Sequence, residues 1–303
     1  AKRVLPVLAA FAGVVTPAIV YYFAAGYMPE YRHGWGIPTA TDIAFAIGVI
    51  TMLGNMVSAA MKAFLAALAV IDDLIAIVVI ALFYGAGVNF MDLIAAAAVT
   101  GLLVYTNKQG YLRPLPYCVL GLVLWYLVLK SGVHATIAGV VLAMTIPFKG
   151  KVLDKVVYPM EEWAHALKNW VNFFIIPLFS FLNAGVSFAD FSLENLFHPV
   201  IIGVSLGLIL GKQLGIFSAV YILVQSKAIK MPTNTTWPEI YGTAILCGIG
   251  FTMSLFVATL AFPPGITQEM AKVGIFIGSI VAGLLGAVVL TLAYQIRKMR
   301  GKI

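Results

Sequence analysis

The segment AAMKAFLAALAVIDDLIAIVVIALFY, residues 59–84, holds two adjacent aspartates, Asp72 and Asp73, in the middle of an apolar run. About twenty apolar residues are enough to cross a bilayer as a helix. A carboxylate at the centre of such a helix costs about 2.5–3.5 kcal/mol even on the lenient insertion scale. The adjacent pair therefore predicts an ion or proton site inside a membrane transporter.

The composition of the whole chain supports a membrane protein. Of its 303 residues, 62% are hydrophobic and 10% are charged, whereas soluble domains carry about 25% charged residues. The predicted fold class is an all-α integral membrane protein built as a helical bundle. The two cysteines, Cys118 and Cys247, lie in apolar runs, which is more typical of packing than of a disulfide or a metal site. No cofactor is expected.

Ten apolar segments are expected to cross the membrane: 4–28, 36–53, 59–84, 91–106, 115–130, 133–147, 170–188, 199–225, 239–262 and 270–296. The stretch 148–169 carries lysines, glutamates and Trp163, which predicts a cytoplasmic loop with an interfacial helix.

Basic residues set the expected orientation. With ten spans, fifteen of the 19 Lys and Arg residues lie on the side that holds both ends of the chain, and Arg32, Lys130 and Lys272 lie on the other. Positive loops face the cytoplasm, so both ends of this chain are predicted to be cytoplasmic. The same bias accounts for the net charge of +7 without a nucleic-acid partner.

Four charged side chains lie well inside the predicted spans: Asp42, Asp72, Asp73 and Lys212. Neighbouring helix positions are about 100° apart, so Asp72 and Asp73 point in different directions. Lys212 is the cation at similar depth, and glycines 207, 211 and 215 leave one face of its helix bare for close packing. Two interpretations stay open: ion coupling, or a buried Asp72–Lys212 pair that only holds two helices together.

Two spans are predicted to be interrupted. Pro38 lacks an N–H, and Thr41 and Asp42 compete for backbone hydrogen bonds; an ordinary N-cap at the membrane edge is the alternative. Gly248 and Gly250 weaken a second span, where a small-residue packing face is the alternative.

Each interrupted span is the second in a group of three. This placement predicts inverted-topology repeats with two crossing discontinuous helices. At such a crossing, Asp42 is expected to neutralise the N-terminal half-helix ends and Lys212 the C-terminal ends.

Five segments resemble the signature segments of the NhaA family of bacterial Na+/H+ antiporters. They are TATDIAFA (39–46), AVIDDL (69–74), LKSGVHAT (129–136), GKQLG (211–215) and LCGIGFTMS (246–254). The resemblance implies one antiporter domain over residues 1–303, in the bacterial inner membrane. It would exchange cytoplasmic Na+ or Li+ for external H+ electrogenically, by alternating access, and more actively at alkaline pH.

The resemblance also implies residue roles. Asp72 and Asp73 would carry Na+ or protons, with Lys212 pairing with Asp72. Thr41 and Asp42 would complete the Na+ or Li+ site at the crossing. The residues expected to take part in the pH response are His134, Glu161, Glu162 and His165, although Ala164 stands where relatives often carry a Glu. For His134, an ordinary interfacial histidine is the alternative, and for the other three a solvated helix face.

The family has two helices before the one resembling 4–28, joined by a dimerisation hairpin. We expect this chain to lack them, which leaves homodimerisation open. The expected partners are Na+, Li+, H+ and membrane lipid, and no nucleic acid is expected. A sodium-coupled symporter on the same fold and a cation channel are the alternative functions; an enzyme is not expected, because no nucleophile elbow or paired metal motif occurs in the spans.

Overall fold

A computed structural model describes residues 4–85, 87, 89–152, 155–186, 193–232 and 235–299. The basic residues predicted at positions 2, 3, 300 and 302 lie outside them. The chain divides into two compact units. The first joins Ala1–Ala76 to Phe179–Ile303, and the second is Ile77–Leu178.

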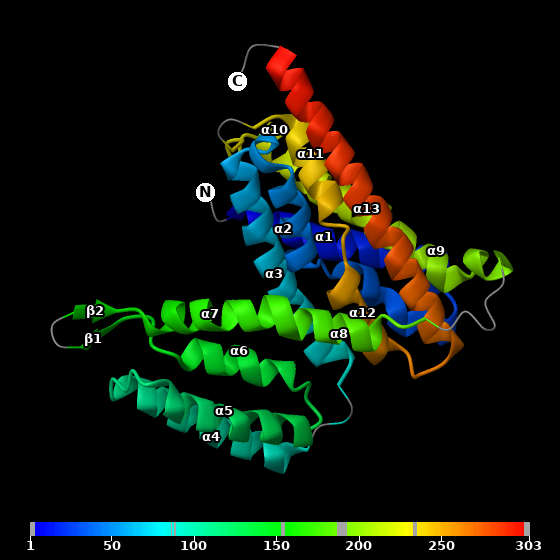
Figure 1. Cartoon of the computed structure of the whole chain (residues 1–303). Coiled ribbons are helices and arrows are strands. Elements are labelled where there is room, and N and C mark those ends of the chain that lie inside the picture. Colours follow the sequence, from blue (N-terminus) through cyan, green and yellow to red (C-terminus); the bar gives the residue numbers. More distant parts are fainter. Residues whose placement is uncertain are drawn as a thin grey trace. The chain divides into compact units, whose positions relative to one another are not determined.

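The first unit contains the site residues and is helical throughout its described part (Figure 1). Its N-terminal part holds α1 (Val4–Tyr21), a π-helical turn (Tyr22–Gly26), a 3-10 helix (Pro29–Thr39), α2 (Ile43–Met52), a 3-10 turn (Gly54–Met56) and the start of α3 (Ala59–Phe83). Its C-terminal part holds most of α8 (Ile176–Asn183), a 3-10 turn (Leu193–Phe197), α9 (Pro199–Leu206), a π turn (Gly207–Gly211), α10 (Lys212–Gln225), α11 (Trp237–Leu246), α12 (Phe251–Ala261) and α13 (Ile266–Met299).

Both predicted interruptions are present, so the prediction of two discontinuous helices is confirmed. The 3-10 helix Pro29–Thr39 and α2 are bent by 43° across residues 40–42, and α11 and α12 by 44° across residues 247–250. The first half-helix begins at Pro29 rather than at the predicted residue 36, because Glu30, Arg32 and His33 interrupt the apolar pattern without ending the helix.

The predicted bare face of the Lys212 helix is also confirmed. A Cβ on Gly211 would meet Pro17, and one on Gly215 would meet the backbone of Ala12, both in α1. A Cβ on Gly207 would meet Pro38 of the first discontinuous helix. Glycine at these three positions therefore lets α10 and the turn before it lie directly against α1 and the first break.

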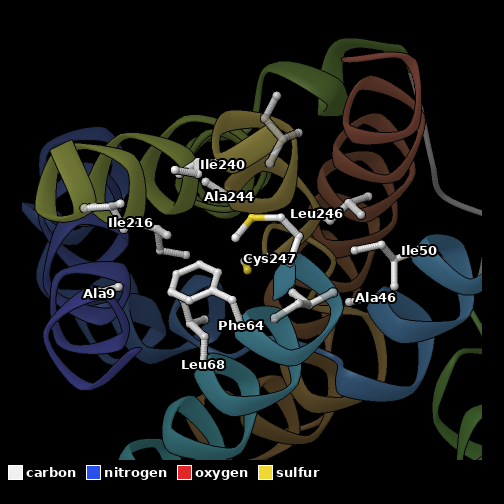
Figure 2. Close-up of a cluster of buried hydrophobic side chains, with 14 of the residues drawn as sticks. Ala9, Ala46, Ile50, Phe64, Leu68, Ile216, Ile240, Ala244, Leu246 and Cys247 are labelled. Atoms are coloured by element: carbon white, nitrogen blue, oxygen red, sulfur yellow. The ribbon is translucent and has the colours of Figure 1, made fainter. Parts of the chain in front are cut away.

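An apolar cluster fills the inside of the first unit (Figure 2). Phe64 and Leu68 of α3 lie beside Ile216 of α10. The other labelled members are Ala9, Ala46, Ile50, Ile240, Ala244, Leu246 and Cys247. The cluster packs α3, α10 and α11 together and includes Cys247 and Ile249 of the second break. The polar groups at that break therefore lie in a close-packed apolar setting.

The second unit contains the rest of α3, then α4 (Phe90–Lys108), α5 (Pro114–Lys130), α6 (Thr136–Thr145) and α7 (Pro159–Trp170). A hairpin of β1 (Gly150–Val152) and β2 (Lys155–Val157) precedes α7, with Gly150 opposite Val157. A π turn (Val171–Ile175) then joins α7 directly to α8. The hairpin falls in the predicted loop 148–169, where the sequence indicated only a loop and a helix; residues 153 and 154 lie outside the described part.

Within the described residues, five helices are long and apolar enough to cross a membrane, and counting each bent pair as one span raises this to seven. The apolar helices α5 and α6 are shorter, as expected for the short predicted segments. The segment predicted at 170–188 follows the π turn and α8 as far as Asn183, and its last two residues lie outside the described part. These helices confirm the all-α membrane fold class.

Candidate functional site

The two helix breaks are hydrogen-bonded to each other. The backbone N–H of Asp42 donates to the carbonyl oxygen of Ile249 at 2.7 Å. The Thr41 hydroxyl donates to the carbonyl oxygen of Cys247 at 2.8 Å, and the Ser254 hydroxyl donates to that of Ile37 at 2.8 Å. Backbone groups that a helix break leaves unpaired are thus satisfied by the other broken helix, which fixes the crossing inside an apolar setting.

Asp42 binds the N-terminal ends of two half-helices at once. Its Oδ1 accepts the N–H of Phe45 in α2 at 3.1 Å. Its Oδ2 accepts the N–H of Thr252 in α12 at 2.9 Å, and also the Thr252 hydroxyl. A carboxylate at a helix N-terminus is favoured by the helix dipole, so this side chain, only 2% exposed, neutralises both positive ends. This arrangement agrees with the electrostatic role expected for Asp42.

Ser279 of α13 completes the cap of α12. Its Oγ accepts the N–H groups of Gly250 and Phe251 at 3.2 and 3.1 Å. The C-terminal half-helix ends receive hydroxyl donors, Thr41 and Ser254, rather than the predicted ammonium of Lys212.

Gly248 and Gly250 make the crossing possible through close approach. A Cβ on Gly248 would overlap the backbone carbonyl of Leu208, and one on Gly250 would overlap the Ser254 hydroxyl. Pro38 is buried just before the first break. The three residues predicted to interrupt the helices therefore all lie at the crossing.

Lys212 is bound to Asp72. Its Nζ lies 2.6 Å from Oδ2 of Asp72, and both side chains are fully buried. A buried ion pair of this kind requires close geometry to offset the cost of desolvation. The pair joins α3 to α10.

Each of the adjacent aspartates keeps one buried oxygen that accepts no hydrogen bond among the described residues: Oδ1 of Asp72 and Oδ1 of Asp73. Thr41 faces the Asp72 carboxylate with its hydroxyl and its backbone N–H, but not in a geometry that satisfies Oδ1. Asp73 lies within electrostatic reach of Asp72, Asp42 and Lys212. Buried carboxylate oxygens without a donor are costly, so these two atoms remain open to a proton or a cation.

The predicted pH-response residues lie in the second unit. Nδ1 of His134 is 3.0 Å from the Thr136 hydroxyl, just before α6. Glu161, Glu162 and His165 are exposed on α7, with both glutamates in its first turn. Their part in a pH response stays a prediction.

Several contacts at the crossing could not be predicted from the sequence. Thr252 lies just after the second break, and its bond to Asp42 spans 210 positions. Ser279 lies in an unbroken apolar helix and had no signal. No group of three or more His, Cys, Asp or Glu side chains suited to a metal occurs in the described ranges, so any cation site here must draw on hydroxyl or carbonyl oxygens as well.

A sequence profile of the family described as Na+/H+ antiporter 1 matches residues 1–290. The chain belongs to this family. It is 48% identical to the Na+/H+ antiporter NhaA of Caulobacter vibrioides over 294 residues, which cover 96% of this chain and 71% of that protein. It is 47% identical to the NhaA of Nitrobacter hamburgensis over 290 residues, covering 95% and 71%, and 48% identical to that of Mesorhizobium japonicum over 298 residues, covering 96% and 74%.

The predicted NhaA-family membership is therefore confirmed. The family is one of antiporters, which places the chain among transporters and not among enzymes. Together with its apolar helices, it makes the chain a multi-pass bacterial membrane protein.

Proposed function

We propose that this protein exchanges cytoplasmic Na+ or Li+ for external H+ across the bacterial inner membrane. The observation that carries the proposal is the pair of buried, unsatisfied oxygens on Asp72 and Asp73. They lie on consecutive residues of α3, in the same unit as the crossing whose helix ends are already neutralised by Asp42. An unpaired carboxylate is unfavourable in such a setting, so it binds a proton or a cation.

Competition for these carboxylates couples the two ions. Asp73, whose carboxylate is not held by an ammonium, is assigned as the principal Na+ ligand, with the Asp72 oxygen and Thr41 beside it. When Na+ is bound, its charge replaces the proton, and when protons are bound the site repels Na+. If Asp72 and Asp73 each give up a proton for one bound Na+, the cycle moves net charge and is electrogenic.

Lys212 links the protonation of Asp72 to Na+ binding at Asp73. Its ammonium compensates the Asp72 carboxylate in the present arrangement. Protonation of Asp72 would release Lys212. A structural role for the pair is compatible with this release of Lys212. While Asp72 is ionised, the same contact holds α3 to α10.

Asp42 is assigned an electrostatic role. Both of its oxygens are engaged by the N-terminal ends of α2 and α12, so its charge attracts a cation to the crossing without a direct bond being required. The prediction that Asp42 is itself a Na+ or Li+ ligand requires one of these bonds to be given up.

The membrane arrangement is also part of the proposal. Ten spans form one antiporter domain with inverted repeats, and alternating access exposes the crossing to either side. The basic residues support cytoplasmic ends and a cytoplasmic segment 148–169. His134, Glu161, Glu162 and His165 are proposed to set the response to pH.

Symport and channel functions are less well supported. A small anionic solute would need a cation at the crossing, and in the described part of the crossing Lys212 already binds Asp72. A filter usually needs rings of ligands from several subunits or pore loops, whereas this site uses one aspartate pair.

Exchange in membrane vesicles tests the proposal. Everted vesicles acidified by respiration are loaded with a pH-sensitive dye, and Na+, Li+ or K+ is added. The wild type is expected to release protons with Na+ and Li+ but not with K+. Asp73→Asn should abolish this release, whereas Asp92→Asn, at the start of α4, should retain it. Retained exchange in Asp73→Asn would overturn the site assignment.

A further inference from the structure

A buried carboxylate outside the exchange site, Glu239, is not used by the mechanism above. It is the third residue of α11 and is 1% exposed. Burying a carboxylate at this depth is costly unless it is fully hydrogen-bonded. The donors to the Glu239 carboxylate therefore show which helices this side chain connects.

Glu239 receives donors from three elements. Its Oε1 accepts the backbone N–H of Ser58, the residue before α3, at 3.3 Å. Its Oε2 accepts the backbone N–H of Thr236, before α11, at 3.1 Å. Nη1 of Arg297, near the end of α13, lies 3.3 and 3.4 Å from the two oxygens. One side chain thus joins the beginnings of α3 and α11 to the end of α13.

The two helices whose starts meet at Glu239 carry the two halves of the exchange site. α3 carries Asp72 and Asp73, and α11 ends at the break that begins with Cys247. Ser58 and Asp72 are fourteen positions apart, or about 21 Å along a helix at 1.5 Å per residue. α3 is therefore tied to α11 through Glu239 at its start and to α10 through Lys212 at its middle. The contact at the middle involves Asp72 of the proposed exchange site, whereas the contact at the start lies fourteen positions away from it.

We propose that Glu239 is a positioning residue for Na+ binding, which fixes α3 against the broken helix so that the Asp73 carboxylate stays in register with the crossing. The proposal rests on the proposed Na+/H+ exchange. A Na+ ion needs several oxygens held together from different elements, whereas a proton needs one carboxylate oxygen. Loosening α3 should therefore weaken Na+ binding and leave proton binding nearly unchanged.

The test compares Glu239→Gln with the wild type in dye-loaded everted vesicles, with Na+ titrated at several pH values. Glutamine keeps the shape of the side chain but loses the charge that the donors of Ser58, Thr236 and Arg297 bind. We expect the half-saturating Na+ concentration to rise about tenfold, in line with the strength of hydrogen bonds to charged groups. The maximal rate per folded molecule should stay within about twofold and the proton affinity, read from the pH dependence of half-saturation, should not move.

Ser58→Ala is the matched control. It removes the hydroxyl that accepts the Met61 N–H at 3.3 Å but keeps the Ser58 N–H that binds Glu239. It should lower thermal stability without changing the half-saturating Na+ concentration. If Glu239→Gln does not accumulate in the membrane, Glu239→Asp takes its place, because the shorter side chain keeps the charge for Arg297 but not the reach to Ser58; the same rise is expected.

Two failures are distinguishable. A wild type without Na+-driven proton release would overturn the exchange function itself. A wild type that exchanges, together with a Glu239 variant whose half-saturating Na+ is unchanged, or whose rate alone falls, would overturn the positioning role.

Discussion

Nζ of Lys212 lies 2.6 Å from Oδ2 of Asp72, and neither side chain is exposed. This contact gives the two neighbouring aspartates of α3 different surroundings. One Asp72 oxygen is bound by an ammonium, whereas Asp73 has no such partner within hydrogen-bonding distance in the described residues. The adjacent pair is thus one compensated and one uncompensated carboxylate.

Replacing Lys212 should destabilise the protein. Lys212→Gln leaves Asp72 buried without its counter-charge, a change that costs about 3–5 kcal/mol when one partner of a buried pair is removed. Thermal unfolding of the purified protein in detergent measures the loss. The double variant Lys212→Gln with Asp72→Asn removes both charges and should recover at least half of the lost stability while exchange stays impaired. An unchanged melting temperature in Lys212→Gln would show that the pair is not formed.

Replacing Asp42 should weaken Na+ binding and stability together. Asp42→Asn removes the charge shared by the starts of α2 and α12, and the lost cap should cost about 1–2 kcal/mol. The uncompensated helix ends should then repel cations and raise the half-saturating Na+ concentration. Asn89→Ala removes the cap of α4, where Oδ1 accepts the Met91 N–H at 3.0 Å, and serves as a control with comparable destabilisation and normal Na+ affinity. Normal Na+ affinity in Asp42→Asn would contradict the electrostatic role.

Adding one methyl group at the second break should disturb the crossing. The Cβ of Gly248→Ala would overlap the Leu208 carbonyl and lie 2.9 Å from Cβ of Ala282, and overpacking of this kind costs about 1–3 kcal/mol. Stability and exchange should both fall. In Gly139→Ala, in α6, the new Cβ meets nothing within 4 Å, so helix stability should be unchanged or slightly raised. Equal behaviour of the two variants would contradict the close approach.

The sequence predicted those residues of the candidate site that are unfavourable in their own segment. Asp72 and Asp73 interrupt an apolar run, and Gly248 and Gly250 weaken a helix, so each is visible without knowing its neighbours. The contacts that complete the site join distant positions: Thr252 to Asp42, and Ser279 to the start of α12. Hydroxyl residues are common in apolar helices, so nothing local distinguishes these two from packing residues.

Two features of the fold were not predicted because their segments lack a regular apolar pattern. The first half-helix starts at Pro29, in a polar stretch whose first residues are exposed, so no apolar pattern marks where this helix begins. The hairpin of β1 and β2 is three residues long on each strand, too short for an alternating pattern to be read. Glu239 lies near a predicted span end, where a carboxylate is ordinary, so its contacts with Ser58 and Arg297 also had no local signal.

Competition between Na+ and protons for the Asp72 and Asp73 carboxylates can be observed as proton release from the purified protein when Na+ binds. Na+ is added to the wild type in weakly buffered detergent solution, and the pH change is recorded with a soluble indicator, with K+ as the control ion. Saturable proton release is expected with Na+ and should be absent in Asp73→Asn. Saturable Na+ binding to the wild type without proton release would show that the two ions do not compete.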